Sequence, residues 1–367
     1  MTSVQRGAHA LPVAQPTFLL FSGYNDRAVV ALCRFFARQR LPFVIVAAGP
    51  TDAIWRTTWA SFVILSRLDK RLDVALFQAA VQAVQQPRLV YCPTTEFMNQ
   101  FVLDQRLALQ AIGLQVGLPA APVYFQLTSK LQSAAVVQQL TGIHPPPAIA
   151  WSHLKTPCVL KPIHNVSGAQ EMVYPQLCST YEQLQSALKG LDPAQWFAQA
   201  WVEGQSHYLC GYLARDGEHA SFWQENLLQQ PGGKSMVLAR SGANPGVDVD
   251  RLFIGLHHLG FHGPFMMELI SDAQGTLHFI EINPRFWGPL QLALTACPRL
   301  LTLYARDHGA IVSEPPPTTK GPHWYAWAQG ARQGNCRYYP GAYGLPIENL
   351  LRQHDVYAAP DTHALHS

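Results

Sequence analysis

Charged residues are scarce in this chain, and no run of them is strongly basic. Of the 367 residues, 13% are charged, and 26 Lys and Arg against 23 Asp and Glu leave a formal charge of +3. A protein that binds nucleic acid normally carries a basic patch or stripe. The scattered charges exclude such an electrostatic footprint, so we expect no nucleic-acid partner.

Clustered cysteines and long hydrophobic segments are also missing. The seven cysteines stand far apart without a C-x-x-C pair, which is typical of reduced, buried thiols rather than of a zinc site. No apolar stretch approaches the ~18 residues that cross a membrane, and residues 1–15 lack the apolar core of a secretory signal. We expect a cytoplasmic protein with no membrane partner.

Two common enzyme motifs are absent as well. The first apolar run, residues 17–22, leads into Ser22-Gly23-Tyr24-Asn25 and not into G-x-G-x-x-G, which excludes a dinucleotide-binding fingerprint. No G-x-S-x-G elbow is present either, so a serine nucleophile of that kind has no support.

The chain does contain ample material for buried cores, since 48% of it is hydrophobic. Four short apolar runs, at 17–22, 43–47, 62–65 and 89–91, alternate with segments of helical periodicity at 26–40, 74–84 and 97–112. This alternation predicts a doubly wound α/β domain with a parallel sheet over residues 17–125, preceded by a disordered tail, 1–16.

The pattern changes near residue 126, where we place a domain boundary. A helix is predicted at 129–140 and another at 248–259. Between them the sequence favours strands at 158–163, 171–174, 196–202, 208–213 and 219–224. This order of helices and strands predicts an α+β domain. Residues 306–367, rich in Pro, Gly, His and Tyr, form a C-terminal extension without a readable pattern.

A hairpin in residues 265–288, FMMELISDAQGTLHFIEINPRFWG, carries the most informative chemistry. If Glu268 pairs with Glu281, a four-residue turn, 273–276, joins the strands. Glu281 and Asn283 then point to the same side, because side chains alternate along a strand. Two facing carboxylates repel each other unless a cation lies between them. Oxygen ligands of this kind suit Mg²⁺, with Mn²⁺ as an alternative.

Two further features of the hairpin bear on this interpretation. Arg285 follows the pair and is placed to meet phosphate oxygens or a developing oxyanion. The alternative is an exposed polar face with solvated carboxylates. Leu277 and Phe279, expected on the Glu281 side of the strand, argue against that alternative.

The pattern E…E-x-N-P-R resembles the metal and phosphate signature of the ATP-grasp superfamily. FIEINPRFWG is most similar to the carboxylate–amine ligase branch, distantly related to carbamoyl-phosphate synthetase and biotin carboxylase. The resemblance implies an α/β N-terminal domain followed by an α+β ATP-grasp domain. It further implies a central subdomain at 126–202 and a C-terminal subdomain with the Mg/ATP site at 203–305.

The resemblance also implies two lysines that bind nucleotide phosphates. Lys161 lies on a predicted strand ahead of a small-residue loop that includes Ser167 and Gly168, and backbone N–H groups of such a loop can cradle phosphates. Family members usually have more than one glycine in that loop. Lys130 opens the helix at 129–140, where a bound anion would offset its unfavourable position near the helix N-terminus. The alternative for both is an ordinary surface lysine.

The adenine-binding segment implied by the resemblance is the end of the strand at 196–202. Backbone groups of Gln199, Ala200, Trp201 and Val202 would pair with the adenine edge, and Glu203 is the nearest carboxylate for the ribose. A loop at 231–235 carries Lys234, a candidate catalytic residue. It either closes over substrate or simply connects two strands.

The resemblance implies a ligase that uses ATP to activate a carboxylate as an acyl phosphate and passes the acyl group to an amine, releasing ADP and phosphate. The expected partners are a small-molecule carboxylate and an amine, such as an amino acid, with a homodimer as the candidate assembly. Two alternatives stay open. One is a carboxylase of the same fold that uses bicarbonate, and the other is an ATP-binding protein without catalysis.

Overall fold

A computed structural model describes residues 15–68, 71–85, 88–166, 173–315 and 317–366. Within these ranges the chain forms one parallel and two antiparallel sheets. The predicted combination of a parallel sheet with antiparallel material is confirmed. The predicted tail, 1–16, lies outside the described residues except for Gln15 and Pro16. The Gln15 side chain exchanges hydrogen bonds with the backbone of Ile311.

The N-terminal sheet has five parallel strands in the order β3-β2-β1-β4-β5. They are β1 (Thr17–Phe21), β2 (Phe43–Ala47), β3 (Val63–Ser66), β4 (Leu89–Tyr91) and β5 (Leu114–Gln115). The helices of this part are α1 (Asp26–Gln39), α2 (Val74–Val84), α3 (Glu96–Asp104) and α4 (Arg106–Ala111). The single helix predicted over 97–112 is therefore wrong, because Gln105 leaves helical geometry and separates α3 from α4. The strand order reverses between β1 and β4.

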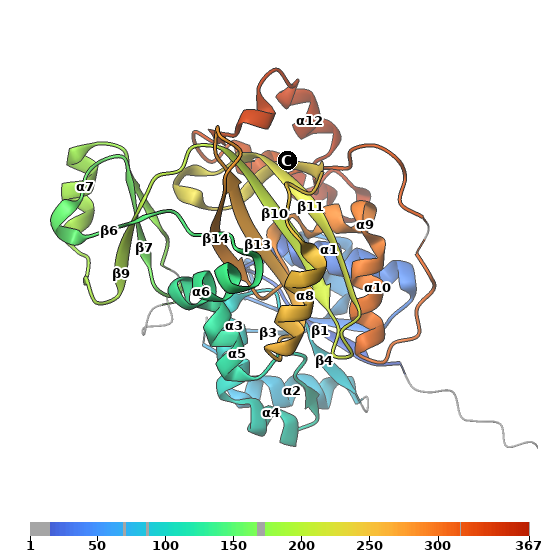
Figure 1. Cartoon of the computed structure of the whole chain (residues 1–367). Helices are drawn as coiled ribbons and strands as arrows, with labels where there is room; N and C mark the ends of the chain where they lie inside the picture. Colours follow the sequence, from blue (N-terminus) through green and yellow to red (C-terminus); the bar gives the residue numbers. More distant parts are fainter. Residues whose placement is uncertain (1–14, 69–70, 86–87, 167–172, 316, 367) are drawn as a thin grey trace, which may run out of the picture.

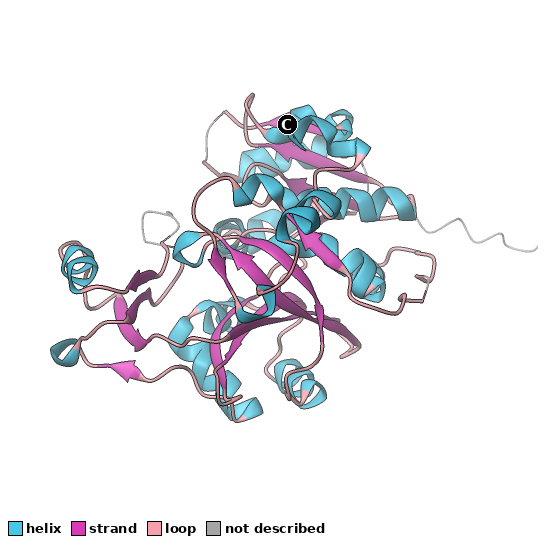
Figure 2. Cartoon of the chain, turned by 90° about the horizontal axis from the view of Figure 1, so that it is seen from above, coloured by secondary structure: helices cyan, strands magenta, loops and turns pink. Residues whose placement is uncertain are grey.

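A small antiparallel sheet follows, with the order β6-β9-β7-β8. It is reached through α5 (Ala121–Thr128) and α6 (Lys130–Thr141), and it contains β6 (Ala148–Ile149), β7 (Cys158–Pro162), β8 (Gln176–Cys178), β9 (Trp196–Ala200) and helix α7 (Tyr181–Leu188). This sheet projects from one side of the molecule in Figure 1 and Figure 2. The strand predicted at 171–174 is wrong for its described part. Val173 instead donates its N–H to the carbonyl of Asn165 in a loop contact.

The largest sheet is antiparallel and has the order β14-β13-β10-β11-β12-β15, with β16 beside β11. Its strands are β10 (Gln205–Leu213), β11 (His219–Gln229), β12 (Met236–Gly242), β13 (Gly263–Ser271), β14 (Leu277–Asn283), β15 (Trp324–Ala326) and β16 (Arg337–Tyr338). The remaining helices are α8 (Val249–His258), α9 (Ala293–Ala296), α10 (Pro298–Asp307), α11 (Ala328–Ala331), α12 (Ile347–Gln353) and α13 (His363–His366). The C-terminal stretch thus supplies two strands to this sheet.

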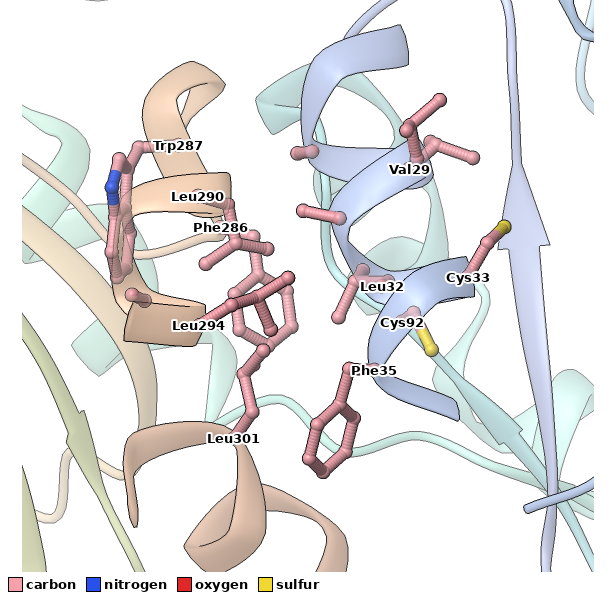
Figure 3. Packing of buried hydrophobic residues seen from close by; sticks show 14 of the residues in the cluster. Val29, Leu32, Cys33, Phe35, Cys92, Phe286, Trp287, Leu290, Leu294 and Leu301 are labelled. Carbon is pink, nitrogen blue, oxygen red and sulfur yellow. The ribbon is translucent and has the colours of Figure 1, made fainter. Parts of the chain in front are cut away.

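Both faces of the large sheet are covered by apolar packing. On one face, residues of α6 and α8 pack against Leu209, Phe265 and Met267. On the other face, α1 of the N-terminal part and the α9–α10 region share one continuous core. Figure 3 shows Leu32 and Phe35 of α1 facing the side that carries Phe286, Leu290 and Leu301. Burial on this scale, at about 25 cal/mol per Å² of apolar surface, holds the N-terminal sheet against the large one.

Two of the predicted boundaries fall inside helices. Residue 125 lies in α5, whose Tyr124 accepts a hydrogen bond from Asn99 of the N-terminal part while Leu127 belongs to the core under the large sheet. Residue 305 lies in α10. The C-terminal end is also tied back, because Arg34 of α1 forms a two-bond ion pair with Asp361 at 2.7 and 2.8 Å.

A buried histidine beside α10 makes stability depend on pH. His308 donates from Nδ1 to the Tyr304 carbonyl at 2.9 Å, while its Nε2 is buried without a described partner. Burial lowers the pKa of His308 from its usual 6.5 to about 4, despite the hydrogen bond to Tyr304 and the charge of Asp307. Arg215 and His262 also face this group and favour its neutral form.

Unfolding should therefore become easier as the pH falls through the window from 6.5 to 4. The unfolded chain takes up the proton first, so the stability present above pH 6.5 is lost progressively toward pH 4. A pKa shift of this size lowers the free energy of unfolding by on the order of 3 kcal/mol across this pH window. His308→Gln keeps a donor but cannot be protonated, so chemical unfolding at a series of pH values should show a flatter acid limb. The exposed His258→Gln is the control, and an unchanged slope in His308→Gln would contradict this account.

Candidate active site

A cavity of about 510 Å³ lies where the three sheets meet. The N-terminal sheet contributes residues that follow β1 and β4, the small sheet contributes residues of β7 and residues at the end of β9, and the large sheet contributes β13 and β14. The structure brings most of the predicted site residues to this one cavity: Lys130, Lys161, Ala200, Trp201, Val202, Lys234, Glu268, Glu281, Asn283 and Arg285.

The predicted register of the acidic hairpin is confirmed, since Glu268 lies opposite Glu281. One detail differs from the expectation. A bulge at Ile280 pairs Leu269 with Phe279, and the turn is one residue longer than predicted. The bulge also reverses the faces beyond it. Leu277 and Phe279 pack against the core under the sheet, while Ile280 and Glu281 both line the cavity. The argument that placed Leu277 and Phe279 beside Glu281 is therefore wrong.

Hydrogen bonds fix the two carboxylates in the cavity wall. Glu268 Oε1 accepts from Ser206 Oγ at 2.9 Å, and Glu281 Oε1 accepts from Asn283 Nδ2 at 2.7 Å. Lys130 Nζ lies 3.4 Å from Glu281 Oε2. The same ammonium donates to Asn165 Oδ1, and Asn165 Nδ2 donates to Glu96 Oε2 at 3.0 Å. These contacts join the hairpin, α6, the loop after β7 and the start of α3 into one network.

The environment drives the protonation of the two glutamates in opposite directions. Burial and the charge of Glu281 raise the pKa of Glu268 to about 7, against the lowering effect of Ser206 and Lys161. Burial also raises the pKa of Glu281, but Lys130, Asn283 and Lys161 together outweigh it, and the net shift is downward. Such a pair is a strained arrangement that a cation between the carboxylates would relieve. The donor set of two facing carboxylates and an amide oxygen fits Mg²⁺.

Lys161 and Lys130 converge because α6 is tied to the end of β7. The backbone N–H of Lys130, the first residue of α6, donates to the carbonyl of Ile163 at 3.0 Å. Both side chains are buried. Burial and the neighbouring charge of Lys130 lower the pKa of Lys161 to about 8. Two buried ammonium groups aimed at one cavity favour an anionic ligand such as a phosphate chain. The surface-lysine alternative is therefore excluded for both.

Replacing Lys161 with alanine should weaken ATP binding far more than adenosine binding. A charge-assisted contact contributes roughly 1.5–3 kcal/mol, or about 10- to 150-fold in affinity. Titration calorimetry with both ligands measures the difference, and the exposed Lys189→Ala in the same subdomain is the matched control. Equal weakening of ATP and adenosine would assign Lys161 a role in the fold instead.

The predicted adenine segment is brought to the cavity only in part. Gln199 lies in β9 between β6 and β7, and its side chain donates to the Pro146 carbonyl at 3.1 Å, so it does not line the cavity. Ala200 lines the cavity, but its N–H donates to the Pro147 carbonyl. Trp201 and Val202 follow the strand and border the cavity. Glu203 is exposed and lies outside the lining, and Ser167 and Gly168 lie outside the described residues.

The two candidate catalytic residues lie at different depths. Lys234 is exposed at the mouth of the cavity, where its ammonium lies 5.8 Å from the centre of the Tyr174 ring. Its loop is held at the base by a hydrogen bond from Gln230 N–H to the Ser235 carbonyl. Arg285 is half-buried, donates to the Phe286 carbonyl at 3.1 Å, and acts electrostatically on Glu96.

Comparison with known proteins finds similar solved structures but no match by sequence. No model of a known protein family and no curated protein matches the sequence. Among solved structures, the chain is similar to the biotin carboxylase domain of Hydrogenobacter thermophilus 2-oxoglutarate carboxylase, which was solved with MgADP and bicarbonate. The TM-score is 0.60 at 15% identity, over 81% of this chain and 70% of that one.

Two other solved structures support the same conclusion. A biotin carboxylase from Campylobacter jejuni gives a TM-score of 0.60 at 12% identity, over 83% of this chain and 74% of that one. An L-amino acid ligase from Bacillus licheniformis gives a TM-score of 0.56 at 12% identity, over 83% of this chain and 78% of that one. All three are ATP-grasp enzymes. This chain has the ATP-grasp fold.

Several residues that line this ATP-grasp cavity were missed by the sequence analysis. They follow β1, β4 or β14, or belong to the C-terminal stretch: Tyr24, Asn25, Arg27, Thr94, Thr95, Glu96, Phe97, Trp287, Arg337 and Tyr339. The first group stands at the carboxyl ends of the two strands where the sheet order reverses. Ligands of open α/β sheets bind in the crevice at such a switch point. That rule, applied to the segments at 22–25 and 92–97, was the available signal.

The end of the cavity formed by these residues carries unsatisfied polar groups. Among the described residues, four buried atoms have no hydrogen-bond partner there: Thr94 Oγ1, Thr95 Oγ1, Glu96 Oε1 and Trp287 Nε1. Burial raises the pKa of Glu96, although its bond from Asn165 and the charge of Arg285 oppose the shift. An unpaired buried polar atom costs about 1–3 kcal/mol, so this group is suited to a polar ligand.

None of the helices in the described ranges combines the length and apolar character needed to cross a membrane.

Proposed function

We propose that this protein is an ATP-dependent carboxylate–amine ligase that works through an acyl phosphate and releases ADP and phosphate. One observation carries the proposal. A single cavity joins the facing carboxylates of Glu268 and Glu281 to two buried lysines and an arginine, beside a second group of unsatisfied polar atoms. The first set suits a metal-bound nucleotide, and the second suits a polar substrate. Similar solved structures include an L-amino acid ligase and carboxylases.

The nucleotide would lie along the wall formed by the small sheet. Its adenine would meet the backbone of Trp201 and Val202, and its phosphates would extend toward Lys130 and Lys161. Glu268, Glu281 and Asn283 would hold Mg²⁺, or Mn²⁺ in its place. The metal, when bound, supplies charge neutralisation for the phosphate oxygens. The loop with Ser167 and Gly168 belongs to the same proposal through the resemblance of the sequence alone.

The reaction has two steps. A carboxylate oxygen of the acid attacks the γ-phosphorus, the bond to the bridging oxygen breaks, and ADP leaves. The amine nitrogen then attacks the acyl carbon, the amide bond forms, and phosphate departs with the original carboxylate oxygen while the nitrogen loses a proton. Arg285 would stabilise the negative charge that develops on oxygen in both steps. Lys234, on its loop at the mouth, would close over the bound substrates.

The acid and the amine would occupy the end of the cavity near β1 and β4. Thr94, Thr95 and Trp287 offer two hydroxyl groups and an N–H donor there, and Glu96 offers a carboxylate oxygen. A small substrate that carries both a cationic and a polar group, such as an amino acid, would satisfy them. Arg285 lies between this end and the phosphate site, where the acyl phosphate must form.

A carboxylase that uses bicarbonate as its acid is a second candidate, because one similar structure was solved with bicarbonate bound. It would release ADP only when bicarbonate is supplied, and its product would be heavier by one carboxyl group. A non-catalytic ATP-binding protein is disfavoured because the cavity keeps the whole predicted set of metal and phosphate ligands: Glu268, Glu281, Asn283, Lys130, Lys161 and Arg285.

A screen for ADP release tests the proposal. The protein is incubated with Mg-ATP and pairs of amino acids or small acids and amines, with and without bicarbonate, and product masses are then measured. We expect ADP release that requires both an acid and an amine, and a product lighter by one water than their sum. ADP release that requires bicarbonate in place of an amine would favour the carboxylase.

A further inference from the structure

Arg337, in the C-terminal stretch, also lines this cavity. It lies on β16, which pairs with β11 through Gln229 opposite Arg337. Its guanidinium carbon is 4.2 Å from the centre of the Trp201 ring and 4.6 Å from the centre of the Tyr339 ring. Two aromatic faces therefore hold this cation in one orientation at the cavity wall.

The N–H donors of the stacked guanidinium are available to a ligand. None of its N–H groups donates to an acceptor within the described parts of the chain, and no carboxylate there lies within ion-pair distance. Two other cavity cations differ in this respect. Lys130 is paired with Glu281 and Asn165, and Arg285 donates to the Phe286 carbonyl. An arginine presents five donors in a rigid fork that fits phosphate oxygens.

Tyr339, one of the two rings that contact Arg337, is itself held in place. Tyr339 is buried, and its hydroxyl donates to Gln229 Oε1 at 2.6 Å. The backbone N–H of Tyr339 donates to the Leu227 carbonyl, and that of Gly341 donates to Gln205 Oε1 at 2.7 Å. These contacts fasten residues 337–341 onto β10 and β11. A loose surface arginine would lack such a support.

The position of Arg337 defines which part of a nucleotide it can meet. Trp201 stands at the adenine end of the cavity, and the charge of Arg337 also acts on Glu268, at the metal end. Arg337 therefore lies between the base and the metal carboxylates, while Lys130 lies beside Glu281. The first phosphate after the ribose passes through this interval in any nucleotide that spans it.

We propose that Arg337 binds the α-phosphate of the nucleotide, so that the C-terminal stretch completes the nucleotide site. This inference rests on the proposed function for the presence of a nucleotide, but not on which acid or amine is used. The ligand class is an adenosine phosphate, and the contact is shared by AMP, ADP and ATP. Arg337 is a binding residue here, with no role in the chemical steps.

Binding of AMP, ADP, ATP and adenosine to the full-length protein, without acid or amine, tests the proposal by titration calorimetry. Arg337→Gln should weaken all three phosphorylated ligands by a similar factor, about 10- to 100-fold. Adenosine binding should change by less than about twofold, because it lacks the phosphate. Arg332→Gln, an exposed arginine of the same stretch that lies outside the cavity, should leave every affinity unchanged.

Arg337→Lys keeps the inference testable if Arg337→Gln does not fold. It retains the charge but loses the planar fork, so AMP binding should weaken less than in Arg337→Gln and still measurably. Unchanged AMP affinity in a folded variant would overturn the inference, as would equal weakening of AMP and adenosine. Loss of ATP affinity with intact AMP affinity would overturn it too, by assigning Arg337 to a later phosphate. If the parent binds no nucleotide, the proposed function fails together with this inference.

Discussion

Replacing Glu281 with glutamine should lower the rate of Mg²⁺-dependent ADP release by a factor of about 10²–10³. Glutamine keeps the shape and can still accept the hydrogen bond from Asn283, but it carries no charge. A metal held by Glu268 and Glu281 would lose one of its two carboxylates, and the buried ammonium of Lys130 would lose its ion-pair partner. Initial rates at a series of Mg²⁺ concentrations measure both effects.

A matched control for Glu281→Gln exists on the same sheet. Glu225 of β11 accepts an ion-pair contact from Arg240 Nε at 2.7 Å and does not line the cavity. Glu225→Gln therefore removes a paired carboxylate of similar type without touching the proposed metal site, and we expect its rate to stay near that of the parent. If the rate of Glu281→Gln stayed within about threefold of the parent rate, the metal assignment would be contradicted, because loss of such a group should lower the rate far more.

Replacing Arg285 with lysine should lower the turnover rate by about 10²-fold, with only a few-fold change in ATP affinity. Lysine retains the charge but loses the planar, two-donor fork that fits developing charge on neighbouring oxygens. Single-turnover kinetics with saturating ATP separate the chemical step from nucleotide binding.

The control for Arg285→Lys is Arg299→Lys in α10. Arg299 forms a surface ion pair with Glu218 at 2.5 Å, away from the cavity. The same substitution there should leave turnover unchanged, since exposed ion pairs contribute little. If Arg285→Lys weakened ATP binding as strongly as it slowed turnover, Arg285 would be a binding residue rather than a catalytic one.

The acidic hairpin shows how far local sequence reasoning reaches. Strand alternation and the pairing of Glu268 with Glu281 were predictable because both depend on residues within one short hairpin. The bulge at Ile280 was not. It inserts one residue without a turn signal in the sequence and sends Phe279 and Glu281 to opposite faces of the sheet. The metal site therefore stays a prediction, and one of the arguments for it, the placing of Leu277 and Phe279 beside Glu281, is wrong.

The rest of the site depends on contacts between distant segments. Thr94 and Glu96 become site residues because β4 lies beside β1 in the sheet order, which a general rule on switch points could have indicated. Arg337 and Tyr339 have no such signal. They reach Trp201 and Gln229 only because β16 pairs with β11, more than a hundred residues earlier in the chain. Local periodicity carries no information on that pairing.

Only part of the predicted adenine segment reaches the cavity, for a different reason. The end of the strand at 196–202 was assigned as a hinge without knowledge of its neighbours. Gln199 turned out to lie between β6 and β7, where its backbone is used by the sheet. The exposure of Glu203 likewise depends on the path of the chain after β9. The residues beyond the last paired position, Trp201 and Val202, remain candidates for the role that the resemblance implies.

Transfer of oxygen from the acid to phosphate tests the central claim most directly. The substrate acid, labelled with ¹⁸O in its carboxylate, is turned over with Mg-ATP and the amine, and the released phosphate is analysed by mass spectrometry. The oxygen that attacks phosphorus stays on phosphorus when the amine displaces phosphate, so one labelled oxygen should appear in each phosphate released. Unlabelled phosphate, or AMP in place of ADP, would contradict an acyl-phosphate ligase.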